Sequence, residues 1–318
     1  MIILDEIKGA KKIAIGGHIR PDGDCVGSCM AMYLYLRKAV PDAEVSVYLE
    51  KPADVFGCIK NVSDIKTEID EEDPVDVFIV QDCADDRLGF SRPLFASAKK
   101  TINIDHHITN QGCGNASLVV PNASSTSELI YGVIDHDMID EPIAKALYIG
   151  IIHDTGVFQY TNTSPLTMKI AADLIGYGFD FSKIIEETFY EKTYVQTQIL
   201  GRALLESVMF MDGKCIVSKI SRETMDFYGV DQKDLDGIVS QLKQIKGIDC
   251  AIFMSEVGFQ EYKVSMRSSD RINVAKIAAL FGGGGHKKAA GCTMNGTYHD
   301  SINNLSLQLA KQFVDTSV

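Results

Sequence analysis

The sequence predicts an α/β protein with a mostly parallel sheet in its N-terminal domain and a smaller α/β domain behind it. Short apolar runs alternate with helical patterns over the first half: strands are expected at 12–18, 44–50, 75–81 and 101–105, and helices at 24–39, 124–136 and 142–153. Such alternation is typical of a parallel sheet covered on both faces. The chain has 318 residues, and two domains are expected because single cores rarely grow past about 250–300 residues.

The second half has a different pattern of strands and helices from the first, which predicts a second domain. Strand-like runs at 214–220, 250–256 and 262–268 occur with helical patterns near 231–246, 273–281 and 299–314. Between the halves, the pattern over 165–207 is almost entirely helical, and no Pro or Gly occurs between 179 and 200. We therefore expect a catalytic domain over 1–185, a helical linker over 186–207 and a substrate-binding domain over 208–318.

Composition limits the classes of function. Lys and Arg number 31 against 43 Asp and Glu, a net charge of −12, and proteins that track long duplex nucleic acid usually carry a basic excess. The eight cysteines form no C-x-x-C pair, which predicts reduced, mostly buried thiols rather than disulfides or a thiolate zinc site. We expect no signal peptide, because acidic residues occur where one would need an apolar run, and no apolar run reaches the roughly 18 residues that a membrane span needs. We expect a cytoplasmic protein with no membrane partner.

Four motifs of the first half contain candidate metal ligands. They lie over 16–28, 80–87, 102–109 and 149–160, and they supply His18, Asp22, Asp24, Asp82, Asp105, His106, His107, His153 and Asp154. Three of them follow strand-like runs, and ligands of open α/β sheets bind at the carboxyl ends of strands. We therefore expect these side chains to converge. A single aspartate after a strand is more often a helix or turn cap, but four separate motifs are hard to explain as caps.

The aspartates of such a cluster would repel one another unless cations neutralise them. Four negative charges, balanced by two divalent cations, would come from Asp22, Asp24, Asp82 and Asp154. A pair of metal ions suits phosphoryl hydrolysis because it activates a bridging water and clamps the phosphate oxygens. Mixed imidazole and carboxylate ligands favour Mn²⁺, Fe²⁺, Co²⁺ or Zn²⁺ over Mg²⁺.

Two stretches of the second half predict a phosphate-binding site. The first, 263–274, contains Arg267 and Ser268; the second, 281–291, contains Gly282, Gly283, Gly284, Gly285, His286 and Lys287. Consecutive glycines expose backbone N–H groups and allow close approach of an anion, and arginine can bind a phosphate through two parallel hydrogen bonds. We expect Lys288 to be a solvated charge. This site would give an acidic protein a local positive pocket.

Taken together, these motifs resemble the DHH phosphoesterase superfamily. The resemblance covers nearly the whole chain and rests on H-x-x-PDGD-x-x-GS over 18–28, the later Asp82, the DHH triplet over 105–107, DTG over 154–156 and GGGGHKKAAG over 282–291. The last stretch resembles the DHH-associated C-terminal domain. The subgroup resembled most is the two-domain NrnA type of oligoribonuclease and 3′-phosphoadenosine-5′-phosphate phosphatase, which implies two Mn²⁺ ions as cofactors.

The resemblance also implies a role for each matched residue. His18 and Asp22 would bind one cation, and Asp82 would bridge the pair. The other cation would have the ligands Asp24, His106 and Asp154. Asp105 would orient a ligand histidine, and His107 would face the scissile phosphate as a catalytic and substrate-binding group. The substrate's own phosphate would be held by Arg267, Ser268, Gly282, Gly283, Gly284, Gly285, His286 and Lys287. His153 departs from the pattern of many members, so its role stays open.

The expected function is Mn²⁺-dependent hydrolysis of short single-stranded RNA or linear dinucleotides such as pApA to nucleoside monophosphates. Cyclic di-AMP and 3′-phosphoadenosine-5′-phosphate are further candidate substrates. Two alternatives stay open: a manganese inorganic pyrophosphatase or polyphosphatase of the same superfamily, and a non-catalytic nucleotide sensor. The resemblance is compatible with a homodimer.

Overall fold

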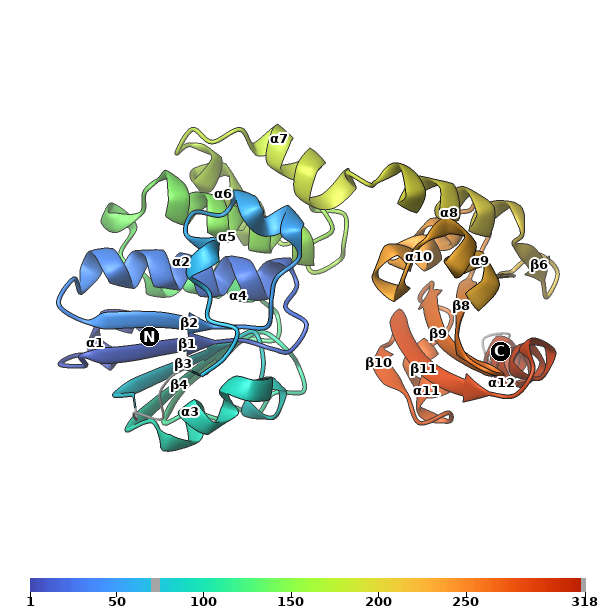
Figure 1. Cartoon of the computed structure of the whole chain (residues 1–318), viewed down its shortest axis with the longest axis horizontal. Coiled ribbons are helices and arrows are strands. Elements are labelled where there is room, and N and C mark those ends of the chain that lie inside the picture. Colours follow the sequence, from blue (N-terminus) through green and yellow to red (C-terminus); the bar gives the residue numbers. More distant parts are fainter. Residues whose placement is uncertain (70–74, 316–318) are drawn as a thin grey trace. The chain divides into compact units, whose positions relative to one another are not determined.

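The structure is a computed structural model that describes residues 1–69 and 75–315. It divides into two compact units, Met1–Glu191 and Lys192–Val318, and each unit has its own sheet (Figure 1). The boundary falls inside the segment 186–207, for which the sequence predicts a linker.

The first unit is built on five parallel strands in the order β2-β1-β3-β4-β5. Their bounds are Lys12–Gly16 for β1, Glu44–Tyr48 for β2, Val77–Gln81 for β3, Lys100–Asp105 for β4 and Ala116–Val119 for β5. The parallel α/β class is therefore confirmed. The last strand was not predicted, because its four residues, ASLV, are too few to show a period.

Helices cover both faces of this sheet (Figure 1). One face carries α2 (Gly23–Ala39), α4 (Thr126–Val133), α5 (Glu141–Asp154) and α6 (Pro165–Ile175), and the other carries α3 (Arg92–Ser97). Successive residues of β3 face opposite sides of the sheet. Val77 and Ile79 belong to the larger core, whereas Phe78 and Val80 belong to the smaller one. Helices α2 and α5 approach closely where a side chain on Gly27 would collide with the backbone of Ala146 and Gly150.

The remaining elements of the first unit are short. They are α1 (Ile3–Glu6), α7 (Phe181–Ile185), the π-helix η6 (Glu186–Tyr190) and the 3-10 turns at Asp54–Cys58, Val62–Asp64, Asp85–Arg87, Gly89–Ser91 and His136–Met138. The expected helical run over 165–207 is interrupted between η6 and α8 (Tyr194–Leu205). Thr193 starts α8 afresh, since its side chain accepts from the Gln196 backbone while the Gln196 side chain bonds back to Thr193.

The second unit has a six-stranded sheet in the order β10-β11-β9-β8-β7-β6. Only β7 and β8 pair in parallel. The strands are β6 (Val208–Phe210), β7 (Cys215–Ile220), β8 (Cys250–Gly258), β9 (Glu261–Ser268), β10 (Gly284–His286) and β11 (Ala289–Asn295). The helices are α8, α9 (Arg222–Tyr228), α10 (Ile238–Lys243), α11 (Val274–Ala279) and α12 (Tyr298–Asp315), with the 3-10 turn η7 (Gln232–Leu235). Two apolar cores result, one around α8 and α10 and the other around α11 and α12.

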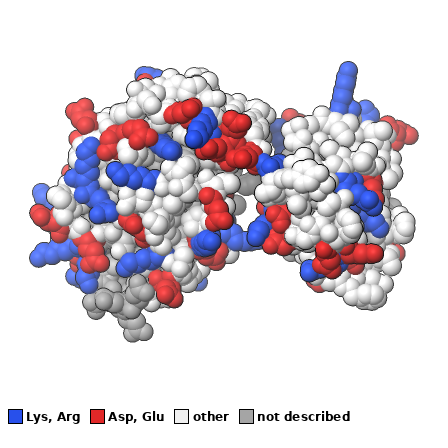
Figure 2. All heavy atoms as spheres, turned by 45° about the horizontal axis from the view of Figure 1, so that its top comes forward, with Lys and Arg blue, Asp and Glu red and all other residues white. Residues whose placement is uncertain are grey.

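Cysteine state, helix length and surface charge are three further features of the structure. All eight cysteines are free thiols, and six are buried. Within 1–69 and 75–315, no helix has the length and apolar character to cross a membrane. Lys and Arg are interspersed with Asp and Glu on the face drawn in Figure 2.

Candidate functional site

Imidazole and carboxylate groups from four distant segments meet at the carboxyl edge of the first sheet. Nε2 of His18, after β1, lies 3.4 Å from Oδ2 of Asp82, after β3. Nε2 of His106, after β4, lies 3.6 Å from Oδ1 of Asp82 and 3.1 Å from Oδ2 of Asp154, at the end of α5. Asp82 thus lies between the two imidazoles.

Three overlapping groups of donor atoms form around this centre, each with its atoms within 4.8 Å of one another: Asp24, His106 and Asp154; Asp82, His106 and His107; and His18, Cys25 and Asp82. The structure therefore brings together the six residues predicted as metal ligands, with Asp22 3.6 Å from His18. It adds a donor that the sequence assigned only as a buried thiol, Cys25, which is fully buried on the first turn of α2.

The loop after β1 positions the first ligands. Asp22 is the N-cap of α2, and its Oδ1 accepts the backbone N–H groups of Asp24 and Cys25 at 3.1 Å. Between the two aspartates, Gly23 lies against the ring of His153, which leaves no room for a side chain. Asp22 therefore begins the helix, and Gly23 allows the chain to pass His153.

Two of the predicted ligands, His18 and His106, are oriented by backbone carbonyls. Nδ1 of His18 donates to the Ile19 oxygen at 2.9 Å, and Nδ1 of His106 donates to the Ala123 oxygen at 3.3 Å. A carbonyl only accepts, so Nε2 of each neutral ring carries the lone pair that a metal ion requires. These Nε2 atoms are the ones that face the carboxylates.

Burial works against ionisation of the carboxylates in this cluster. Burial and the neighbouring aspartates raise the pKa of Asp24 and raise the pKa values of Asp82 and Asp154 well above the usual range. Burial alone would lower the pKa of His18, but hydrogen bonds to Asp22 and Asp82 raise it instead. Crowded, buried carboxylates are an environment that divalent cations neutralise.

Asp105 has a different partner from the expected one. It was expected to orient a ligand histidine, but its Oδ1 accepts from Nδ1 of His107 at 2.8 Å, whereas His106 is oriented by Ala123. The same oxygen accepts the backbone N–H groups of both histidines, and Oδ2 accepts from Asn110. Burial opposes ionisation of Asp105, but these hydrogen bonds outweigh it and lower its pKa. The carboxylate therefore fixes the ring of His107.

His153 has contacts typical of a packing residue. Its ring lies edge-on to Phe56 and Phe189, and its Nε2 is 3.2 Å from the hydroxyl of Thr188. Burial lowers its pKa to about 4, so the ring is neutral at pH 7. These contacts favour a structural role.

In the second unit, the predicted phosphate-binding residues lie on neighbouring strands. Arg267 of β9 is directly opposite Ala289 of β11, which is directly opposite His286 of β10. Directly opposite residues share a face of a sheet, so Arg267 and His286 flank the small side chain of Ala289. Both the His286 and the Lys287 side chains are exposed.

Some members of that set have other partners. The hydroxyl of Ser268 lies 2.8 Å from the backbone oxygen of Ile272 and 3.3 Å from that of Lys287, so it has acceptors within the protein, and its contact with substrate stays a prediction. Lys288, expected as a solvated charge, lies 2.9 Å from Asp270. Part of the glycine run is the edge strand β10 rather than a loop, and Gly283 has no room for a side chain against the backbone of Gly291.

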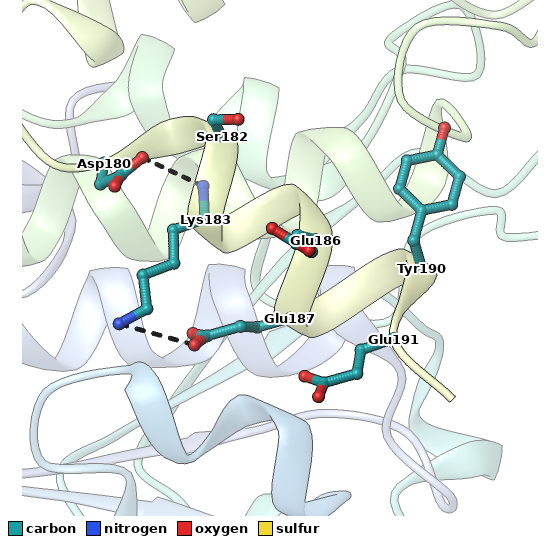
Figure 3. Close-up of a pocket in the computed structure, with 7 residues that line it drawn as sticks. All are labelled: Asp180, Ser182, Lys183, Glu186, Glu187, Tyr190 and Glu191. Atoms are coloured by element: carbon teal, nitrogen blue, oxygen red, sulfur yellow. Dashed lines mark hydrogen bonds and ion pairs between the residues drawn. The ribbon is translucent and has the colours of Figure 1, made fainter. Parts of the chain in front are cut away.

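A separate cavity of about 650 Å³ lies along α7 and η6. Its lining, drawn in Figure 3, consists of Asp180, Ser182, Lys183, Glu186, Glu187, Tyr190 and Glu191. The ammonium of Lys183 lies 3.6 Å from Glu187. None of the predicted site residues lines this cavity.

Comparison with known proteins assigns both units. Residues 12–151 match the model of the DHH family, N-terminal domain, and residues 212–316 match that of the DHHA1 domain. The chain is 26% identical over 313 residues to the bifunctional oligoribonuclease and PAP phosphatase NrnA of Thermus thermophilus, covering 98% of this chain and 92% of the relative. It is 28% identical over 288 residues to the protein of the same name from Bacillus subtilis, covering 89% of each. The crystal structure of an exopolyphosphatase-related protein from Bacteroides fragilis aligns with a TM-score of 0.89 at 25% identity, covering 97% of this chain and 94% of that one. The chain therefore belongs to the DHH phosphoesterase family and combines the family's N-terminal domain with a DHHA1 domain.

Proposed function

We propose that this protein is a Mn²⁺-dependent hydrolase that cleaves short oligoribonucleotides and linear dinucleotides such as pApA to nucleoside monophosphates. We further propose that it converts 3′-phosphoadenosine-5′-phosphate to AMP. The observation that carries the proposal is the placement of Asp82 between the imidazoles of His18 and His106. The names of the relatives from Thermus thermophilus and Bacillus subtilis support the choice of substrates.

The donor set fits two divalent cations. His18 and Asp22 would hold one cation, while the other would have the ligands Asp24, His106 and Asp154, with Asp82 shared. Two features of the structure support this fit: the orientation of both Nε2 atoms toward the carboxylates, and the raised pKa values of Asp24, Asp82 and Asp154. When bound, such a pair supplies an activated water and neutralises charge on the phosphate.

His107 and Asp105 act as a unit on the substrate. Because Nδ1 of His107 donates to Asp105, Nε2 is the nitrogen left to face a phosphate ester. When protonated, Nε2 donates a hydrogen bond to the phosphate or to the leaving oxygen, and Asp105 compensates the charge of the imidazolium. Asp105 is fully buried and accepts four hydrogen bonds, so this orientation is fixed before substrate arrives.

The second unit would anchor the substrate's own phosphate. Arg267 and His286 flank Ala289 on one sheet face, and the exposed Lys287 follows His286 in the chain. The small side chain between them leaves room for an anion that both can contact. The backbone of Gly282–Gly285 would complete this anchor at the sheet edge formed by β10.

Hydrolysis assays with purified protein and Mn²⁺ test the proposal. We expect turnover of pApA, short RNA and 3′-phosphoadenosine-5′-phosphate, with cyclic di-AMP included to compare cyclic with linear substrates. Inorganic polyphosphate and pyrophosphate are the second candidate class, favoured by the name of the Bacteroides fragilis structure. Faster release of phosphate from either of these than of AMP from the nucleotides would contradict the proposal.

Asp82→Asn is the matched active-site variant. Asp82 has a left-handed backbone with φ 60°, which asparagine tolerates better than alanine does. We expect loss of Mn²⁺-dependent turnover with the fold retained. Asp135→Asn is the control, because Asp135 lies outside the cluster and an asparagine can still cap the turn that it begins.

A further inference from the structure

The first turn of α4 contacts two of the proposed cation ligands. The hydroxyl of Thr126 donates to Oδ1 of Asp82 at 3.0 Å, and its backbone N–H donates to Oδ2 of Asp24 at 2.6 Å. The backbone N–H of Ser127 donates to the other oxygen of Asp24 at 2.9 Å. Thr126 is fully buried. One residue therefore links two carboxylates that are 58 positions apart in the chain.

Asp82 needs such a partner because its backbone is strained. Its φ of 60° is unusual for a residue with a side chain, and such a conformation persists only where the surroundings fix it. The Asp82 N–H donates to the Ile104 oxygen at 3.0 Å, which fixes the main chain. The Thr126 hydroxyl fixes the carboxylate, and Oδ2 is left toward His18 at 3.4 Å.

The turn that presents Thr126 is itself anchored by buried polar groups. The Ser125 side chain caps α4 by accepting from the Glu128 backbone at 3.1 Å. Oε2 of Glu128 then accepts from the hydroxyls of Ser124 at 2.7 Å and Thr167 at 2.6 Å. All five residues are buried. The start of α4 is thus tied to α6, and Thr126 has little freedom to move.

The same segment is connected to a third proposed ligand. The side-chain amide of Asn162 donates to the backbone oxygen of Ser124 at 2.8 Å and to that of Asp154 at 3.1 Å. Thr126 therefore bonds the carboxylates of Asp24 and Asp82 directly. Asn162 connects the backbone of Asp154 to Ser124, which lies just before α4. This arrangement holds the carboxylates in place against their mutual repulsion.

We propose that Thr126 is a positioning residue for the cation pair: it binds no cation itself, but its hydroxyl holds Asp82 in the orientation that bridging requires. The inference rests on the proposed function and deepens it, since it names a residue on which cation affinity depends. Loss of a hydrogen bond to a metal-ligating group typically weakens metal binding by about 10-fold to 100-fold.

Mn²⁺ titration of the full-length, metal-free protein tests this inference, with free Mn²⁺ followed by electron paramagnetic resonance. We expect Thr126→Val to weaken Mn²⁺ binding by about 10-fold or more. Thr126→Ser keeps the hydroxyl and should restore binding to near the wild-type affinity. At saturating Mn²⁺, most of the turnover of pApA by Thr126→Val should return, because no ligand is lost.

Thr167→Val is the matched control. Thr167 is as buried as Thr126 and also donates its hydroxyl to a carboxylate, but that carboxylate is Glu128 rather than a proposed ligand. We expect a lower Tm for this variant and a clearly smaller loss of Mn²⁺ affinity than for Thr126→Val, because its effect can reach Asp82 only through the start of α4. If Thr126→Val does not fold, Thr126→Ala removes the same hydroxyl without adding a branched apolar side chain.

The outcomes separate this inference from the function on which it rests. Equal Mn²⁺ affinity of wild type and Thr126→Val would overturn the positioning role while leaving the proposed function intact. Equal weakening by Thr126→Val and Thr167→Val would overturn it too, since the effect would then come from general loosening of α4. A wild-type protein that binds no Mn²⁺ would reject the cation pair, and the positioning role with it.

Discussion

Nδ1 of His107 lies 2.8 Å from Oδ1 of Asp105, and the same oxygen accepts the backbone N–H groups of His106 and His107. One carboxylate therefore fixes both the DHH turn and the imidazole that faces the substrate in our proposal. Its other oxygen accepts from Asn110 at 2.6 Å. The buried carboxylate of Asp105 accepts four hydrogen bonds. Substitution of Asp105 should therefore disturb the orientation of the His107 ring directly.

Asp105→Asn should lower kcat for pApA by about 10-fold to 100-fold, because the amide cannot satisfy all four donors and His107 loses its compensating charge. Mn²⁺ affinity should change much less, since His106 is held by Ala123. Steady-state kinetics and Mn²⁺ titration measure the two effects. The exposed Asp86→Asn is the control. A large loss of Mn²⁺ affinity with normal kcat at saturating Mn²⁺ would show that Asp105 serves the cations instead.

Removal of divalent cations should lower Tm, and the effect should grow with pH. Burial raises the pKa values of Asp24, Asp82 and Asp154 in the folded protein. Without cations, ionisation of these groups costs stability as pH rises above the unfolded value of about 3.9 toward their folded pKa values. Cations bind the ionised form and offset this cost.

Thermal unfolding with Mn²⁺ and with EDTA, at about pH 5.5 and about pH 7.5, measures this effect. The gain in Tm from Mn²⁺ should be larger at the higher pH. A gain that is independent of pH, or that is larger at the lower pH, would show that the buried carboxylates do not bind the ion.

Protonation of His153 should destabilise the folded protein at acidic pH. Its pKa is lowered by burial from 6.5 to about 4, so the unfolded chain binds a proton more readily than the folded protein. This contribution to stability is present above pH 6.5 and is lost as pH falls toward 4, and it amounts to roughly 3 kcal/mol by linkage. In EDTA, His153→Phe should flatten this part of the curve of unfolding free energy against pH. The exposed His136→Gln should leave the curve unchanged.

The two neighbours Arg267 and Ser268 should behave differently. Arg267→Ala should mainly raise KM for pApA, because it removes a phosphate contact and touches no cation ligand in our proposal. Ser268→Ala should leave KM near the wild-type value and lower stability by about 1 kcal/mol, because its hydroxyl bonds Ile272 and Lys287. Steady-state kinetics and thermal unfolding distinguish the two. A raised KM for Ser268→Ala with unchanged Tm would show instead that the serine contacts substrate.

The parallel sheet could be predicted because β1 and β3 contain apolar runs and β4, KTINID, alternates polar residues with Ile102 and Ile104. The strands of the second unit were harder to find where small side chains replace large ones. In β11 the buried positions Ala290, Cys292 and Met294 alternate with Ala289, Gly291 and Thr293. The period of two is present, but alanine and glycine give it little hydrophobic contrast. The three-residue strands β6 and β10 are too short to show any period.

In the site, sequence motifs supplied the charged residues but not the groups that hold them. His18, Asp24, Asp82, His106 and Asp154 lie together in the structure, and their role as cation ligands stays a prediction. Thr126 escaped notice because a hydroxyl in the sequence SSTSE is typical of a helix cap. Its contacts are with residues 44 and 102 positions away, and only the folded chain shows them. The sequence could not show which histidine Asp105 contacts, because His106 and His107 both lie within two residues of it in the chain.

A crystal structure of the protein grown with Mn²⁺, with anomalous diffraction recorded at the manganese edge, tests the central claim most directly. We predict two anomalous peaks about 3.5–4 Å apart, with Asp82 contacting both ions. The first ion should contact His18 and Asp22, and the second should contact Asp24, His106 and Asp154. A single peak, or two peaks that do not share Asp82, at a Mn²⁺ concentration that supports turnover would contradict the two-cation centre.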